Sequence, residues 1–164
     1  MKIDAIKKWK EAMIGGTRTI FAKSGFVAPV AIILKSDTTS MVIGTEFTND
    51  ADKDRFAETI KKVCKDNKVV AILFISEAYT KAVENGKDSE FINENGTLKK
   101  PVREMEGRKE CIVIKFETKL FAESSMIEIV RSTGGEPMLM EEEKGGRTIS
   151  GRFCDLLVNP ISKN

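Results

Sequence analysis

Three glutamates stand where a carboxylate could hold a divalent metal ion at the end of a strand. Glu77 lies just beyond the apolar run 69–75, Glu110 begins the strand-like segment 110–118, and Glu117 lies near the end of that segment, shortly before Lys119. A metal-dependent nuclease uses a carboxylate to bind the ion and a lysine to stabilise the attacked phosphate. Glu-x-Lys also arises by chance in a chain with 32% charged residues. A metal-dependent hydrolase or nuclease using Glu77, Glu110 and Glu117 is therefore an alternative rather than the first expectation.

The chain contains no histidine, which excludes much familiar catalysis. The usual general base near neutral pH, the Cys-His and Ser-His nucleophile pairs and most zinc sites all need that residue. The cysteines, Cys64, Cys111 and Cys154, are odd in number and widely spaced among apolar neighbours, which predicts free buried thiols. The sequence therefore predicts no catalytic residue, no cofactor and no metal ligand.

Glu77 has a structural interpretation that competes with the catalytic one. Burying a carboxylate where a strand leaves the core is costly unless the charge is paired or hydrogen-bonded. Arg108 enters the next strand just before Glu110, so it is the partner we expect for Glu77 if the two strands are neighbours. Tyr79 would then cover this ion pair with its ring.

Charge is unevenly distributed although the net charge is only +2. Residues 1–25 carry six Lys or Arg residues against two acidic ones. A solvated helix face is the ordinary meaning of such a run, and a nucleic-acid contact is the alternative. The residues that would make this contact are Lys2, Lys7, Lys8, Lys10 and Arg18.

The first half of the chain predicts two helices and three strands. Apolar residues at helical spacing predict a helix from Ile3 to Met13. At Gly15-Gly16 we expect either the end of this helix or a kink after which it resumes at 17–23. Segments 26–34 and 41–47 predict a hairpin, with Pro29 at an edge or at the start of pairing. A capped amphipathic helix follows at 50–66, and the uninterrupted apolar run 69–76 predicts a central strand covered on both faces.

The second half predicts a long polar loop at 84–108 and then an antiparallel meander. Alternating side chains indicate strands at 110–118, 125–132 and 138–143, and segment 150–160 predicts a short C-terminal helix. Together the elements predict one α+β domain spanning 1–164. Its mainly antiparallel sheet of about five or six strands would have both longer helices packed on one face.

Composition and the short length of the apolar runs indicate a cytoplasmic protein. Hydrophobic residues make up 41% of the chain, too many for a disordered segment. No run approaches the roughly 20 apolar residues that span a bilayer, and the N-terminus lacks the apolar region of a signal peptide. We expect no contact with a membrane.

Two short motifs resemble a family of uncharacterised bacterial and phage proteins. "FISEAY" at 74–79 and "GRKECIVIKFE" at 107–117 are similar to that family's strand ending in Ser-Glu-Ala-Trp, followed by a variable polar loop and by Arg-x-Glu before another strand. Tyr79 departs from the tryptophan. The residues that match the family's pattern are Lys53, Ser76, Glu77, Ala78, Arg108 and Glu110. The resemblance implies a bacterial or mobile-element source and brings no known activity.

We therefore expect a non-enzymatic binding or accessory protein with a protein partner, and a homo-oligomer as an alternative. The 84–108 loop and the sheet edges are the surfaces predicted for contact. The predicted structural or interaction cluster consists of Lys53, Ser76, Glu77, Tyr79, Arg108 and Glu110.

Overall fold

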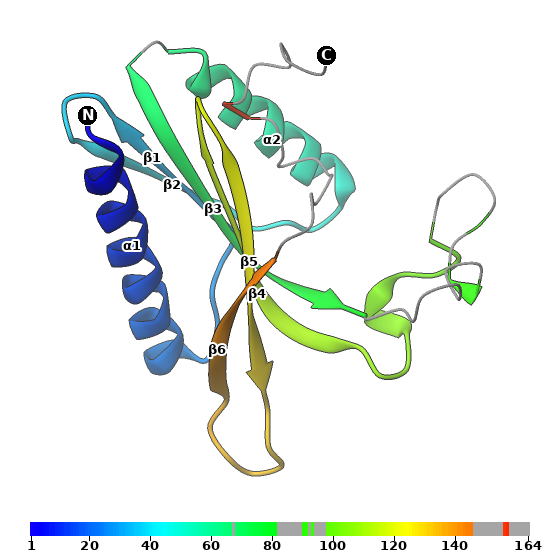
Figure 1. Ribbon diagram of the computed structural model, residues 1–164. Helices are drawn as coiled ribbons and strands as arrows, with labels where there is room; N and C mark the ends of the chain where they lie inside the picture. The colour runs from blue at the N-terminus through cyan, green and yellow to red at the C-terminus, as the bar shows by residue number, and fades with distance from the viewer. Residues whose placement is uncertain (67, 82–89, 92, 94–97, 146–155, 158–164) are drawn as a thin grey trace.

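The fold is built on a single antiparallel sheet (Figure 1). The computed structural model describes residues 1–66, 68–81, 90–91, 93, 98–145 and 156–157. The sheet has six strands in the order β2-β1-β3-β4-β5-β6. Every neighbouring pair is antiparallel. The strands are β1 (Val30–Lys35), β2 (Ser40–Gly44), β3 (Val69–Thr80), β4 (Lys109–Thr118), β5 (Ala122–Val130) and β6 (Met138–Gly145). The predicted α+β class, the hairpin 26–34/41–47, the central strand and the meander are confirmed.

The two long helices lie on opposite faces of the sheet, so the prediction that both pack on one face is wrong (Figure 1). Helix α1 (Ile3–Ser24) packs against one face through Ile6, Ile14 and Phe21. Helix α2 (Asp50–Cys64) packs against the other through Phe56 and Ile60. We refer to these as the α1 face and the α2 face.

The apolar character of β1 and β3 explains this arrangement. In β3, Leu73 and Ile75 belong to the core under α1, whereas Ile72 and Phe74 belong to the core under α2. A strand that is apolar on both faces leaves one face in water unless each face has its own cover. One helix on each side satisfies both faces.

Helix α1 runs without a break through Gly15 and Gly16, so the predicted kink or break is also wrong. Each glycine costs a helix about 1 kcal/mol relative to alanine. Both lie on the exposed side of the helix, and tertiary packing of the buried side keeps the helix continuous. The helix ends at Gly25, whose φ of 67° is left-handed and whose N–H donates to the Phe21 carbonyl.

Strand β3 is longer than predicted and continues through the Ser-Glu-Ala-Tyr motif to Thr80. The described part of the predicted 84–108 loop contains a short 3₁₀ helix, η2 (Val102–Glu104). The predicted C-terminal helix at 150–160 lies outside the described residues except for 156–157. Within the described part of the chain, no helix is long and apolar enough to span a membrane.

Candidate interaction surface

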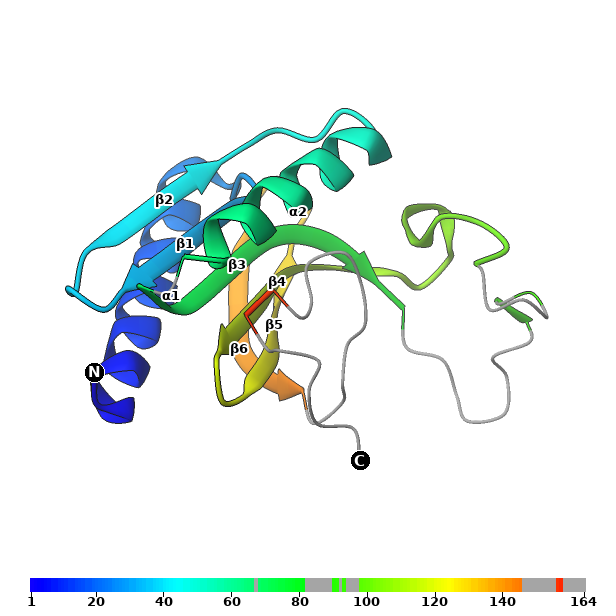
Figure 2. The same cartoon turned by 90° about the horizontal axis from the view of Figure 1, so that it is seen from above.

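Strand β3 runs past the start of its neighbour β1 and leaves part of its edge without a partner strand. The last pair between β1 and β3 is Val30 with Ile75, whereas β3 stays paired with β4 as far as Thr80 with Lys109. Pro29 stands just before β1, and its carbonyl accepts from the Thr45 N–H, on the β2 side, at 3.1 Å. Seen from above, the end of β3 projects past β1 and β2 (Figure 2). We call residues 76–80 the β3 overhang.

An arginine clamp joins β5, β4 and the end of α1 beside the overhang. Arg131 donates from Nε to Glu110 Oε2 at 2.7 Å and from Nη2 to Glu110 Oε1 at 2.9 Å. Its two terminal nitrogens also donate to the Gly25 carbonyl, each at 3.3 Å. The hydrogen bond with Glu110 raises the pKa of Arg131. This bidentate pair fixes the α1 C-terminus against the sheet.

Tyr79 and Arg108 form a second pair on the same face. Tyr79 lies opposite Glu110 in the register, and its side chain is 45% exposed. The Arg108 guanidinium lies 5.6 Å from the centre of the Tyr79 ring and donates to the Met105 carbonyl at 3.4 Å. We use the name strand-end cluster for Glu77, Tyr79, Arg108, Glu110 and Arg131.

The predicted Glu77–Arg108 ion pair does not form. Glu77 Oε1 instead accepts a hydrogen bond of 2.7 Å from the backbone N–H of Val27, in the segment that joins α1 to β1. Burial raises the pKa of Glu77, and so does the nearby Glu110, while the Val27 hydrogen bond and Arg131 act in the opposite direction. The contact that ties down the Glu77 carboxylate is therefore a backbone amide, and Arg108 stacks on Tyr79.

A cavity of about 290 Å³ opens next to Glu77. Three segments that are distant in sequence meet there: the connection after α1, the connection after β2 and the overhang of β3. The residues that line it are Phe26, Val27, Pro29, Glu46, Phe47, Ser76 and Glu77. The cavity therefore combines aromatic rings with two carboxylates.

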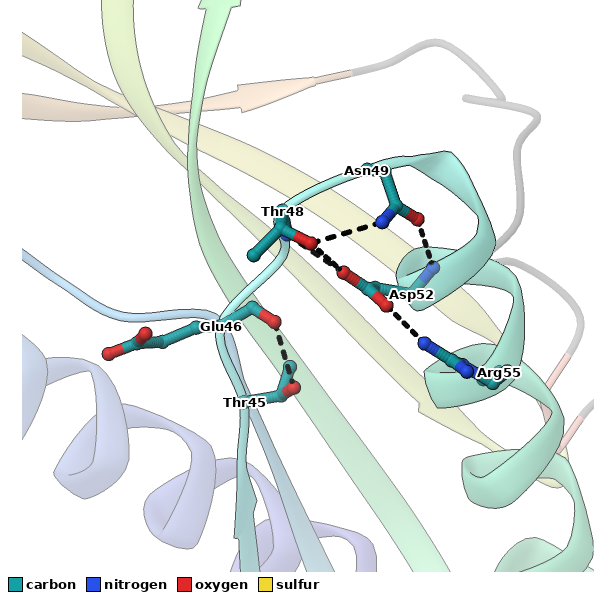
Figure 3. A network of polar contacts seen from close by, with 6 residues as sticks. All are labelled: Thr45, Glu46, Thr48, Asn49, Asp52 and Arg55. Atoms are coloured by element: carbon teal, nitrogen blue, oxygen red, sulfur yellow. Dashed lines mark hydrogen bonds and ion pairs between the residues drawn. The ribbon is translucent and has the colours of Figure 1, made fainter.

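Glu46 and Phe47, which line this cavity, come just before the N-terminal cap of α2. Figure 3 shows Glu46 together with the residues of the cap. Asn49 caps the helix, its side chain accepting from the Asp52 N–H at 2.9 Å. Asp52 accepts hydrogen bonds from Thr48 and Arg55, which lower the pKa of Asp52 to about 2. The Glu46 side chain points away from this network (Figure 3).

Phe47 is anchored by packing on α2. Its ring meets Phe56 edge to face with centres 5.6 Å apart, and Phe56 lies 6.3 Å from Phe74 of β3. Such aromatic contacts add to the area that the rings bury. The wall of the cavity formed by Phe47 is thus part of the core beneath α2.

The other predicted site residues lie apart from the strand-end cluster. Lys53 is in the first turn of α2 and forms an ion pair of 3.0 Å with Asp50. Ser76 lines the cavity, and its hydroxyl donates to the Glu77 carbonyl at 3.1 Å. Of the predicted cluster, the structure thus brings together Glu77, Tyr79, Arg108 and Glu110, without Lys53 and Ser76.

Glu117 lies on the α2 face, whereas Glu77 and Glu110 lie on the α1 face. Successive side chains of β4 alternate between faces, and the even-numbered Ile112, Ile114 and Phe116 belong to the core under α1. Glu117 Oε2 accepts from the backbone N–H groups of Leu156 at 2.6 Å and Leu157 at 3.0 Å. The three carboxylates of the hydrolase alternative therefore do not converge.

No group of three or more His, Cys, Asp or Glu side chains in the described ranges is placed to hold a metal ion. Cys64 and Cys111 are free and buried, as predicted, and Cys154 lies outside the described residues. Burial raises the pKa of Cys64 to about 12, so its thiolate is not formed near neutral pH.

The basic residues of α1 divide into two groups. Lys2, Lys7 and Lys8 are exposed. Lys10 turns toward the sheet, where it forms an ion pair of 2.6 Å with Glu123 and lies 5.1 Å from the Phe116 ring centre, beside a cavity of about 250 Å³. Arg18 donates to the Met140 carbonyl at 3.3 Å. Two of the five predicted nucleic-acid contacts thus hold α1 to the sheet.

The predicted site does not include Arg131, although the alternation of side chains along β5 places this residue on the same face as Glu110. Ile127 and Ile129 point to the α1 face, so the next residue with the same parity is Arg131. Glu110 has the same parity as Ile112 and Ile114 in β4. Because Arg108 shares that parity with Glu110, alternation by itself leaves two arginines as possible partners.

No protein-family model matches this chain, and neither the curated proteins nor the solved structures contain a match to it.

Proposed function

We propose that this chain is a non-enzymatic binding protein that contacts a protein partner through the strand-end cluster. The observation that carries the proposal is the stacked pair Tyr79–Arg108, which is exposed on a face of the sheet. In the described part of the chain, Arg108 has no carboxylate partner; its guanidinium lies over the Tyr79 ring and donates to the Met105 carbonyl. Tyrosine and arginine are enriched among the residues that dominate protein–protein binding energies.

Strand pairing and hydrogen bonds hold the platform under this pair together, which favours binding. Tyr79 stands on β3, and the Arg131–Glu110 clamp fixes the neighbouring strands to the end of α1. A side chain that is already positioned loses less conformational freedom when a partner binds. The pair thus offers a pre-organised contact.

The state of the carboxylates supports binding rather than catalysis. Glu110 is engaged by Arg131, one oxygen of Glu77 by the Val27 amide, and Glu117 by two backbone amides on the opposite face. Hydrolysis that uses a metal requires carboxylates that meet at one ion. These carboxylates instead stabilise the ends of segments.

Photo-cross-linking tests the proposed surface. A benzoylphenylalanine placed at Tyr79 should cross-link a partner in cells that make the protein, and Arg108→Ala in the same chain should reduce the yield strongly. A benzoylphenylalanine at Leu120, which is 85% exposed on the β4–β5 turn, is the matched control. Equal cross-linking from both positions would show that the strand-end cluster is not the contact surface.

Nucleic-acid binding through α1 remains an alternative because Lys2, Lys7 and Lys8 are exposed. It predicts that DNA or RNA binding weakens steeply as salt rises, since each phosphate contact releases counterions. Fluorescence anisotropy with labelled DNA and RNA at low salt measures this. A chain that shows no binding at low salt does not use this surface for nucleic acid.

We also infer a cytoplasmic location and a bacterial or mobile-element source. The two described cysteines are free, which suits a reducing compartment. The source follows from the resemblance of the Ser-Glu-Ala-Tyr and Arg-x-Glu segments, and the genes next to this one would indicate the partner.

A further inference from the structure

We propose that the β3 overhang binds an extended, basic peptide segment of the partner as an added strand, with one Lys or Arg side chain in the cavity between Glu46 and Glu77. This inference rests on the proposed function, since it states how the partner of the strand-end cluster is held.

The overhang offers backbone groups that a strand can use. In an antiparallel strand, about half of the N–H and C=O groups point to each side. Residues 76–80 pair with β4 on one side, and among the described residues no strand pairs with them on the other. Strand β1 starts at Val30, whose partner in β3 is Ile75, so β1 does not reach residues 76–80. An open edge of this kind is a template for an incoming strand.

The outer edge of the sheet at β6 is less suited to pairing. Strand β6 carries Glu141, Glu142, Glu143 and Lys144 in succession, and charged side chains oppose the approach of another strand. The β3 overhang also has a cavity beside it that can select a side chain.

The chemistry of the cavity selects a cation. Its charged lining residues, Glu46 and Glu77, are both acidic, and the rings of Phe26 and Phe47 lie beside them. In the described part of the chain, neither the Glu46 carboxylate nor Glu77 Oε2 has a hydrogen-bond partner. A guanidinium or ammonium group can bind carboxylates and stack on aromatic rings at once.

The size of the cavity suits one side chain. Its volume of about 290 Å³ lies at the lower limit of small-molecule sites, which begin near 300 Å³. A second copy of this chain is a poorer occupant, because pairing two overhangs would bring two acidic cavities together. The partner is therefore expected to be a different, basic segment.

Binding of a designed peptide to the full chain tests the proposal. The probe is a short acetylated peptide that alternates threonine and valine around one arginine, and the control probe has glutamate in place of the arginine. We expect the arginine peptide to bind at least about tenfold more tightly, as the loss of a charge-assisted contact implies. Binding should also slow hydrogen exchange at the amides of residues 76–80 that face away from β4.

Variants of the protein locate the bound arginine. The double variant Glu46→Gln with Glu77→Gln should weaken the arginine peptide about tenfold and leave the glutamate peptide unweakened. Glu58→Gln, an exposed glutamate on α2, is the matched control and should bind like the parent. N-methylation of alternate peptide amides should abolish binding in one of the two possible frames, because only one set of amides faces the sheet.

Three outcomes would overturn the proposal. The first is equal binding of the arginine and glutamate peptides, and the second is N-methylation without effect in either frame. Protection of residues 76–80 that rises with protein concentration alone would identify a second copy as the occupant. If cross-linking at Tyr79 still depends on Arg108 in any of these cases, the proposed function stands and only the strand addition fails.

Discussion

At the scale of single residues, Glu77 is held by a backbone amide, and its variants should show this. Glu77→Ala leaves the N–H of the buried Val27 without its acceptor, so it should lower the free energy of unfolding by about 1–3 kcal/mol. Glu77→Gln keeps an acceptor oxygen and should cost less. Urea unfolding measures both. Equal losses for the two variants would contradict this role, and Arg108→Ala is the control that should change stability by at most about 0.5 kcal/mol.

The raised pKa of Glu77 gives this residue a pH dependence of known sign. A carboxyl whose pKa is higher in the folded state binds its proton more tightly there. Its contribution to stability is therefore present below the ordinary carboxyl pKa and is lost as pH rises through the folded pKa. Between about pH 4 and pH 7, Glu77→Gln should gain stability relative to the parent as pH rises. A constant difference over this range would rule the contribution out.

Glu117 holds Leu156 and Leu157 against the α2 face and is only 3% exposed. Glu117→Ala removes the acceptor of two backbone amides, and hydrogen bonds to a charged group contribute about 1.5–3 kcal/mol each. We expect a large loss of stability and faster hydrogen exchange at the amides of Leu156 and Leu157. Glu58→Ala, on the exposed side of α2, is the control. Unchanged exchange at the two amides would show that this contact is not formed in solution.

At the scale of elements, α1 contains two glycines that its packing does not need. A Cβ at Gly15 or Gly16 would meet nothing within 4 Å outside the helix itself. Gly15→Ala and Gly16→Ala should therefore each stabilise the protein by about 0.5–1 kcal/mol. Thermal unfolding measures the gain. A loss would mean that another surface packs closely on this side of α1.

Gly25 is the matched control for these two substitutions. Its φ is 67°, and a Cβ there would lie 3.3 Å from Pro137 Cγ. Gly25→Ala should therefore destabilise the protein. Opposite changes in stability would distinguish Gly25, which the helix end requires, from Gly15 and Gly16, which the helix only tolerates.

At the scale of the whole molecule, the two cores should unfold together because β1 and β3 contribute residues to both. Phe21→Ala under α1 and Phe56→Ala under α2 each remove a buried ring, at a cost of about 3–5 kcal/mol. Trp9, the single tryptophan, packs against the core under α1. In both variants, tryptophan fluorescence and far-UV circular dichroism should therefore report one common midpoint. A Trp9 transition that stays at the parent midpoint in Phe56→Ala would show that the cores unfold separately.

Much of the fold follows from local patterns, and much of the site does not. Alternation along 110–118 and 125–132 predicts the meander, and the amphipathic pattern of 50–66 predicts α2, because these signals lie within one element. The partner of Glu77 is different. Its donor, the Val27 amide, has no side-chain signature and lies 50 residues away in sequence. Arg108 and Arg131 share the parity that a partner of Glu110 needs, and only the positions of β4 and β5 decide between them.

The sequence by itself determined the α+β class, the antiparallel order of the last strands and the double-sided burial of β3, because residue periodicity and turn chemistry act over a few neighbours. The tertiary structure decided that α1 and α2 cover opposite faces and that α1 continues through Gly15-Gly16, because each depends on burial against distant segments. It also decided where the Ser-Glu-Ala-Tyr motif lies and which residues it contacts. Because β1 starts at Val30, the motif became an open edge, where Glu77 faces an acidic cavity and Tyr79 faces Arg108.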